Sequence, residues 1–566
     1  MLNPRLALRA ARWWRAARLF ESSTMQEYSN LSVLIVDPNP GMRASLHNML
    51  NQSSITKIEY AVSAGTAIRQ LGKKAFDIVL CEYDLGGGSD DGQDGQQLLE
   101  DLRHHRLIGL ETIFIMLTSE GVYSKVISAA ELTPTDYILK PFTVDVLSGR
   151  IGRAIERRAV FIGVHQLIDQ GNPREAIKAC RAGQEQHPRH SAEFLRLRAG
   201  LHLQLNELAE AEEIYQNVFD TRAPGWAALG LARALFAQER HLEAQEVLVE
   251  LIGQNPRLMA AYDLLAKAHA ALGQAAQAKK ILQDAVAISP HMVRRLRQLG
   301  EVAFEAGDLG AAERAFKQVV SKAKYSEFRD PEDHLNLVRA LVKKGDANQA
   351  SGVIRDLERS LRSNANTEAC RAIGSAMVLE MAGNGPAAAN ELSTAVHAVG
   401  ASKGLSTQLK IGLVQTCLSN KLDQAASQVM LNMMSDGESG VSIEQAVDVF
   451  EKAGRHDLAR DVGAQIKLQV QELMSDAADM ASQGEHRAAV SVLTKALRRT
   501  PGNLPVLFAS VEAILQQLNA LGWEVALAEQ AHHQMQTIGR LEPAHPTLAS
   551  LRSQYAATQR KYGIAV

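Results

Sequence analysis

A spacing of 34 residues runs through the middle of this 566-residue chain and restricts what it can fold into. Small residues, large apolar residues and prolines each recur at this interval. The recurring sets are Ala232, Ala266 and Gly300; Ala244, Ala278 and Ala312; Leu248, Leu282 and Phe316; and Pro256 and Pro290. Small residues suit the crossing point of two helices in a hairpin, and proline suits the end of the second helix. One hairpin cannot bury its apolar face alone, so the spacing predicts hairpins stacked into a continuous superhelix.

The helical periodicity begins near residue 158 and continues almost to the end of the chain. The small-residue pattern returns at 477–501 and, more weakly, at 164–188, whereas between about 320 and 465 its spacing lengthens. An aromatic content of only 5% also favours packed helices over sheet sandwiches. We expect roughly nine to eleven helical hairpins, which form an all-α array over 158–546 with a capping helix or tail at 547–566.

The preceding 125 or so residues follow a different pattern, in which short apolar runs alternate with amphipathic segments. The five runs are SVLIV (32–36), KIEYAV (57–62), FDIVLCE (76–82), TIFIMLT (112–118) and DYILK (136–140). Apolar runs of this length are typical of buried parallel strands, and the segments between them are typical of helices. The alternation predicts a doubly wound, five-stranded parallel α/β domain over 31–157. Ligands of such sheets gather at the carboxyl ends of the strands, where Asp37, Glu82, Thr118 and Lys140 lie.

Two resemblances follow from these residues. The segments VLIVD, FDIVLCEYDL, IMLTS and YILKPF resemble, in order and spacing, the signatures of the receiver domain of bacterial two-component response regulators. The block 259–292 resembles the tetratricopeptide (TPR) repeat motif. The combined architecture is similar to bacterial receiver–TPR regulators. The receiver resemblance implies a flavodoxin-like fold, a cis peptide bond before Pro141, and a role in phosphorelay signal transduction.

The resemblance also implies a site, from which this chain departs at two positions. Receivers accept a phosphoryl group on an aspartate after the third strand, hold Mg²⁺ with an acidic pair, and contact the phosphoryl oxygens through a threonine and a lysine. Asp37, Thr118 and Lys140 match, and Tyr137 matches the switch aromatic that acts with Thr118. The acceptor position, however, holds Glu82.

The second acid of the pair is replaced by Pro38, which supplies no carboxylate to a metal ion, so Mg²⁺ binding is expected to be weakened and no cofactor is expected. We expect Glu82 to pair with Lys140 and to hold Thr118 and Tyr137 in a state resembling the phosphorylated one, with less charge than a phosphate has. The alternative is that Glu82 reflects drift in an inactive receiver that is kept for its surface.

Four basic residues are expected on the inner face of the repeats, namely Arg196, Arg233, Lys267 and Arg297. A basic groove would favour an acidic or carboxylate-terminated peptide as partner. The alternative is that these are ordinary solvated helix charges. The acids of the 86–95 loop, Asp90, Asp91 and Asp94, lack the spacing of a calcium site and are expected to be solvated.

Several other functions are disfavoured. No nucleotide-binding glycine loop, metalloprotease motif or nucleophile elbow is present, so no enzymatic activity is expected. The net charge of −2, and the lack of a basic recognition helix after the receiver, argue against nucleic acid as a partner. The sequence shows no apolar run expected to span a membrane. Four widely separated cysteines fit reduced thiols and a cytoplasmic protein, and the arginine-rich residues 1–30 are expected to be a disordered basic extension.

Two functions remain open. In the first, the receiver controls or permanently sets what the repeats bind, and a histidine kinase or another receiver is a further partner. In the second, the receiver serves only for docking or dimerisation and the repeats act as a scaffold. Asp37, Thr118 and Lys140 favour the first function, whereas Pro38 and Glu82 favour the second.

Overall fold

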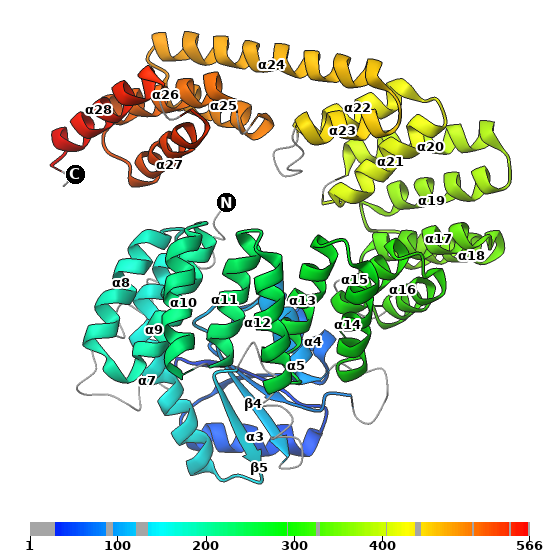
Figure 1. Ribbon diagram of the computed structural model, residues 1–566. Helices are drawn as coiled ribbons and strands as arrows, with labels where there is room; N and C mark the ends of the chain where they lie inside the picture. Colours follow the sequence, from blue (N-terminus) through cyan, green and yellow to red (C-terminus); the bar gives the residue numbers. More distant parts are fainter. Residues whose placement is uncertain are drawn as a thin grey trace. The chain divides into compact units, whose positions relative to one another are not determined.

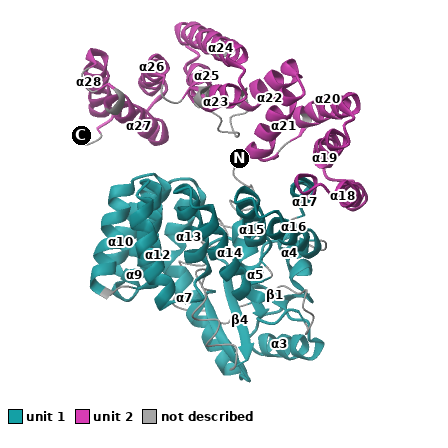
Figure 2. Cartoon of the chain, turned by 45° about the vertical axis from the view of Figure 1, so that its right-hand side comes forward, with its two compact units in different colours: residues 1–340 teal, residues 341–566 magenta. Residues whose placement is uncertain are grey.

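The computed structural model of the protein describes most of the chain as two compact units, residues 1–340 and 341–566 (Figure 2). The described residues are 29–86, 94–119, 134–222, 224–290, 292–323, 329–402, 404–435, 443–500, 503–542 and 545–563. Residues 1–28 of the basic extension, and Asp90 and Asp91 of the 86–95 loop, lie outside these residues.

The first unit begins with the predicted five-stranded parallel sheet. Its strands are β1 (Ser32–Val36), β2 (Lys57–Ala61), β3 (Ile78–Glu82), β4 (Ile113–Ser119) and β5 (Asp136–Lys140). They are hydrogen-bonded in the order β2-β1-β3-β4-β5, and every neighbouring pair is parallel. The chain therefore crosses over between β1 and β3, which places the carboxyl ends of β1, β3 and β4 side by side.

Helices cover both faces of this sheet (Figure 1). They are α3 (Pro40–Gln52), α4 (Ala64–Lys73), α5 (Gly95–His104) and α7 (Val144–Asp169). Alternate residues of each strand face opposite sides, so the sheet has two apolar cores. Apolar residues of α4 and α5 pack with Val79 and Phe114 on one face, and those of α3 and α7 pack with Leu80 and Ile115 on the other.

The last helix of the receiver is also the first helix of the repeats. Its N-terminal half buries Leu147 and Ile151 in the receiver core, and its C-terminal half buries Phe161 and Val164 against α8 and α9. The expected boundary between residues 157 and 158 therefore falls inside an unbroken helix of 26 residues. This continuity means that the receiver and the first repeat share a rigid element.

The remaining helices of the first unit form the predicted array of hairpins. They are α8 (Pro173–Gln186), the short 3₁₀ helix η1 (Pro188–His190), α9 (Ser191–Gln204), α10 (Leu208–Arg222), α11 (Gly225–Ala237), α12 (His241–Gln254), α13 (Met259–Ala271), α14 (Ala275–Ile288), α15 (Val293–Glu305), α16 (Leu309–Ala323) and α17 (Pro331–Lys344), which reaches the limit of the unit. Gly300 shows why small residues recur every 34 positions. A Cβ atom at Gly300 would lie 2.4 Å from the ring of Phe316, so the two helices can cross closely only without one.

The second unit continues the helical array. It contains α18 (Ala347–Ser360), α19 (Thr367–Met381), α20 (Gly385–Ala401), α21 (Thr407–Ser419), α22 (Asp423–Ser435), α23 (Ile443–Lys452), α24 (His456–Ser482), α25 (His486–Arg499), α26 (Leu504–Leu521), α27 (Val525–Leu541) and α28 (Pro546–Lys561). By length and composition alone, α26 could cross a membrane, although no membrane-spanning run was expected from the sequence. Half of it is buried, and Val511 and Ile514 pack in the core that it shares with α25, α27 and α28. That burial is typical of a core helix.

Candidate functional site

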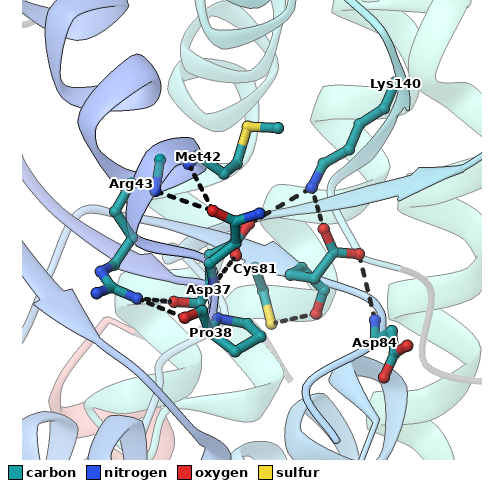
Figure 3. Close-up of polar contacts among 10 residues, drawn as sticks. Asp37, Pro38, Met42, Arg43, Cys81, Asp84 and Lys140 are labelled. Atoms are coloured by element: carbon teal, nitrogen blue, oxygen red, sulfur yellow. Dashed lines mark hydrogen bonds and ion pairs between the residues drawn. The ribbon is translucent and has the colours of Figure 1, made fainter. Parts of the chain in front are cut away.

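The four polar residues predicted to meet at the carboxyl edge of the sheet do meet there. Asp37 follows β1, Glu82 ends β3, Thr118 lies near the end of β4, and Lys140 ends β5. Lys140 Nζ donates hydrogen bonds to Asp37 Oδ2, at 3.4 Å, and to Glu82 Oε2 (Figure 3). A single ammonium group therefore joins the first and third strands through two carboxylates.

Glu82 is held at both carboxylate oxygens. Lys140 donates to Oε2, and the backbone N–H of Asp84 donates to Oε1 at 3.2 Å. The carbonyl of Glu82 accepts a hydrogen bond from Cys81 Sγ at 3.2 Å. Burial strongly raises the pKa of the Cys81 thiol, so the thiol stays protonated and can donate this bond. The expected pairing of Glu82 with Lys140 is thus present, and the glutamate uses both oxygens of its carboxylate within the protein.

Asp37 is almost completely buried, with 1% of its surface exposed. Its Oδ1 accepts from the backbone N–H of Asn39 at 2.7 Å, and its Oδ2 accepts from Lys140. Arg43 closes the same edge, because its Nη1 donates to the carbonyls of Asp37 and Pro38 at 2.6 and 2.9 Å (Figure 3). The position next to Asp37 therefore contributes a carbonyl that is already occupied, in place of a second carboxylate.

This donor set does not fit the Mg²⁺ ion that receivers hold. Mg²⁺ prefers an octahedron of oxygen ligands that includes carboxylates free to bind it. Here Asp37 and Glu82 both accept from the Lys140 ammonium, and the Pro38 carbonyl accepts from Arg43. No group of three metal-ligating side chains occurs within the described parts of the chain.

The two switch residues lie on neighbouring strands. Thr118 is fully buried, and its hydroxyl donates a hydrogen bond to the carbonyl of the next residue, Ser119, at 3.4 Å. Tyr137 is half-buried and packs against the core that contains Cys81 and Met116. The Lys140–Pro141 peptide bond is cis, as the resemblance implied. The structure thus brings Thr118 to the predicted edge, and it places Tyr137 on the neighbouring strand β5, three residues before Lys140.

The inner-face basic residues fall into different environments. Arg297 is compensated by Asp333, since its Nε and Nη2 donate to the two carboxylate oxygens at 2.5 and 2.8 Å. Because Asp333 neutralises its charge, Arg297 does not add to the basic character expected of the groove. Lys267 is exposed on α13. Arg196 on α9 and Arg233 on α11 line a cavity that the receiver also lines.

Receiver helix α5 lies against the inner helices of the repeats. Arg294 Nη1 donates to His104 Nδ1 at 3.3 Å. Burial raises the pKa of Glu100 to about 7, although the nearby guanidinium groups of Arg295 and Arg294 act to lower it. The receiver therefore occupies part of the inner face of the repeats, which the sequence did not predict.

The expectation for one acid of the 86–95 loop, Asp94, was wrong. Asp94 was expected to be solvated, but it is the N-cap of α5, and its Oδ1 accepts from the backbone N–H of Gln97 at 2.7 Å. Burial raises the pKa of Asp94 to about 6. Asp94 therefore orients the helix that faces the repeats.

Sequence reasoning also missed the pair formed by Arg295 and Asp263. Arg295 Nε and Nη2 donate to the two oxygens of Asp263 at 2.7 and 2.9 Å, and only 2% of the arginine side chain is exposed. Acid and base are separated by 32 residues here and by 36 in the Arg297–Asp333 pair. A search for opposite charges about one repeat apart would have found both pairs.

We expect the protein to lose stability as the pH rises through the range in which Glu100 ionises. Its folded-state pKa of about 7 lies above its ordinary value of 4.5, so folding favours the protonated form, and this contribution is present below pH 4.5 and lost towards pH 7 and above. The loss is expected to be at most about 3 kcal/mol.

Urea unfolding at pH 5 and pH 8 measures this dependence. Glu100→Gln should flatten the part of it that comes from this carboxyl group. Exposed Glu246→Gln on α12 serves as the control and should leave the pH dependence as it is in the parent protein. Equal pH dependence in all three proteins would contradict the assignment to Glu100.

Comparisons with known proteins agree with this architecture. Residues 33–152 match the response regulator receiver domain, and residues 164–225, 229–293 and 264–327 match the tetratricopeptide repeat. The fold and these matches define the chain as a receiver domain joined to TPR repeats. Its N-terminal domain belongs to the response regulator receiver family.

Individual relatives cover the receiver. Chemotaxis protein CheY-3 of Vibrio cholerae serotype O1 is 29% identical over 128 residues, which are 23% of this chain and 94% of that protein. Chemotaxis protein CheY of Pseudomonas aeruginosa is 30% identical over 128 residues, 22% of this chain and 98% of its own. Among solved structures, a tetratricopeptide repeat protein from Parabacteroides merdae is similar over 42% of this chain and 90% of its own, at 15% identity and a TM-score of 0.31.

Proposed function

We propose that this protein is a response-regulator-like signalling protein whose receiver no longer switches by phosphorylation. In this proposal, Glu82 and Lys140 fix the receiver in one state, and that state sets which proteins the TPR repeats bind. The protein acts in the cytoplasm without an enzymatic activity or a bound Mg²⁺. Its partners are proteins or peptides with acidic groups, and a histidine kinase or a second receiver is a further candidate.

The Glu82–Lys140 ion pair carries this proposal. A phosphoryl acceptor must present a carboxylate oxygen to the donor, and lysine must be available to neutralise the charge that develops during transfer. Both oxygens of Glu82 accept hydrogen bonds within the protein, and Lys140 is shared between Glu82 and Asp37. One ammonium group and two carboxylates are therefore already engaged with one another at the place where a phosphoryl group would need them.

Two contacts support a link between the receiver and the repeats. Helix α7 is continuous from the receiver core into the first repeat, so a change at one end is transmitted through a rigid helix. Helix α5 places Glu100 and His104 near Arg294 on the inner face. A peptide that used this part of the inner face would compete with α5, so the receiver limits where a partner binds.

The second candidate is a scaffold whose receiver has only a docking role. The shared helix α7 also favours this function, because it fixes the receiver to the array whatever the state of the pocket. The two candidates differ in one respect: the signalling function requires that a change in the Glu82 pocket alters partner binding by the repeats.

The first test is the intact mass of the full chain after incubation with Mg²⁺ and acetyl phosphate. We expect no phosphoryl adduct on the parent protein and a hydroxylamine-labile adduct of one phosphoryl group on the Pro38→Asp, Glu82→Asp double variant. Pro38→Asp, Asp84→Asn serves as the matched control and should acquire no adduct. A labile adduct on the parent protein would overturn the proposal and restore a conventional phosphorelay.

The second test compares partner capture. Proteins retained from a lysate by the parent chain are identified, and each is then measured for affinity to the Glu82→Ala variant. A change in affinity supports the signalling function. Unchanged affinities for every partner would favour the scaffold.

A further inference from the structure

A cavity of about 410 Å³ lies between the receiver and the first repeats, away from the Glu82 pocket. One wall is the amino edge of the sheet, where Thr112 precedes β4, Ile113 begins it, and Thr135 precedes β5. The second wall is α7, and the third is formed by the inner sides of α9 and α11. Because β4 has seven residues, this edge is about 20 Å from the carboxyl edge that holds Glu82 and Lys140.

Five arginines line the cavity, and only two acids accompany them. The arginines are Arg103 of α5, Arg157 and Arg158 of α7, Arg196 of α9 and Arg233 of α11, and the acids are Glu111 and Glu193. Glu193 is engaged by Arg157, whose Nε donates to it at 3.1 Å, and Arg158 lies 3.8 Å from Asp77. The walls therefore carry an excess of positive charge that comes from four separate helices.

These guanidinium groups lie close enough to affect one another. Burial lowers the pKa of Arg103, and the charges of Arg157 and Arg196 lower it further. His165, on the same wall, has its pKa lowered to about 4 by burial, against the opposing effect of Glu193, so it is neutral at pH 7. Arg103 Nε is buried and makes no hydrogen bond to the described residues. A donor of this kind in a charged cavity indicates an anionic acceptor.

The rest of the lining is apolar or aromatic. Leu110, Leu197 and Ile168 line the cavity together with the rings of Phe161 and Tyr215. A simple inorganic anion would leave this surface in contact with water, whereas an organic ligand could bury it. The volume is also in the range of pockets that hold small molecules.

We propose that this cavity is a binding site for a small organic anion of nucleotide size, with its phosphate groups on the arginines and its ring on the apolar wall. Arg103 and Arg196 would hold the phosphate oxygens from opposite sides, since arginine binds phosphate with two parallel N–H groups. The ligand would bridge receiver and repeats, and would act independently of the Glu82 pocket. The proposal goes beyond the proposed function and does not depend on it.

Isothermal titration calorimetry on the full chain tests this site. The probes are ATP, GTP and inorganic pyrophosphate, each without Mg²⁺ and at two salt concentrations. We expect at least one nucleotide to bind, to bind more weakly at higher salt, and to bind more tightly than pyrophosphate. The Arg196→Gln, Arg233→Gln double variant should weaken nucleotide binding at least about tenfold.

The matched control is the Arg181→Gln, Arg314→Gln double variant, which removes two exposed arginines on α8 and α16 outside the cavity. It loses the same net charge and should bind the nucleotide as the parent chain does. Arg103→Gln is a second cavity variant with a single change on the receiver side, and it should also weaken binding. Unfolding midpoints of the unliganded variants show that each one is folded.

Four outcomes would overturn the proposal. The first is that neither ATP nor GTP binds at millimolar concentration, and the second is that the cavity variants and the control variant bind the nucleotide with equal affinity. The third is that pyrophosphate binds as tightly as the nucleotide, and the fourth is that the Glu82→Ala variant loses nucleotide binding. The third would reduce the site to a simple anion site, and the fourth would place the ligand in the receiver pocket.

Discussion

Replacing Lys140 by methionine is expected to lower the free energy of unfolding of the receiver by about 3 kcal/mol at pH 7. The ammonium group joins Asp37, which is 1% exposed, to Glu82, whose side chain is 14% exposed. Without it, two carboxylates remain at the edge of the core with no cation between them. Methionine keeps most of the apolar stem, so the loss reports mainly the charge.

Hydrogen exchange under increasing urea, followed on peptides that cover β1 and β3, measures this loss in the receiver. Lys74→Met is the matched control, because Lys74 pairs with Glu59 while their side chains are 53% and 43% exposed. Ion pairs of that kind contribute roughly 0–1 kcal/mol. Adding Glu82→Gln to Lys140→Met should recover part of the stability. Equal effects of the Lys140 and Lys74 changes would show that the pocket charges are solvated and not coupled.

The meeting of Asp37, Glu82 and Lys140 could be predicted because the sequence shows where each strand ends, and the sheet brings those ends together. Each apolar run ends at its polar residue, and parallel strands bring their carboxyl ends to one edge. Glu82 and Lys140 are 58 residues apart, yet the runs that precede them were sufficient to bring them together. The hairpins were equally predictable, since the position of Gly300 against Phe316 is imposed by the close crossing of two helices.

Contacts between the receiver and the repeats could not be predicted in this way. Helical periodicity gives the face of a helix that is buried, but not the domain that buries it. Glutamate is usually found at the surface, so the sequence predicts a solvated side chain for Glu100. Its pKa is raised because the side chain is buried where α5 lies close to Arg294 and Arg295 of α15. Asp94 is a good helix cap, but the glycines before it are typical of a loop and concealed the start of α5. The unbroken α7 was missed as a shared element because nothing in its sequence marks where one domain ends.

Asp263→Ala is expected to lower the free energy of unfolding of the repeats in the first unit by about 3–5 kcal/mol. Asp263 of α13 holds the guanidinium group of Arg295 of α15, and that side chain is 2% exposed. Alanine would leave a buried positive charge without its carboxylate. The remaining Nη1 of Arg295 is already buried without a hydrogen bond to the described residues, so it cannot compensate.

The double variant Asp263→Leu, Arg295→Met separates the charge from the packing. A buried ion pair can be replaced by apolar residues of similar volume with little net loss, so this variant should unfold close to the parent chain. Asp448→Ala, which breaks the exposed pair with Lys452, is the control and should cost no more than a few tenths of a kcal/mol. Urea unfolding followed by hydrogen exchange on peptides from α13 and α15 gives the measurement. If Asp263→Ala were as mild as the control, solvent would have to reach Arg295 in solution, and the inner face that α5 contacts would then be open to a partner.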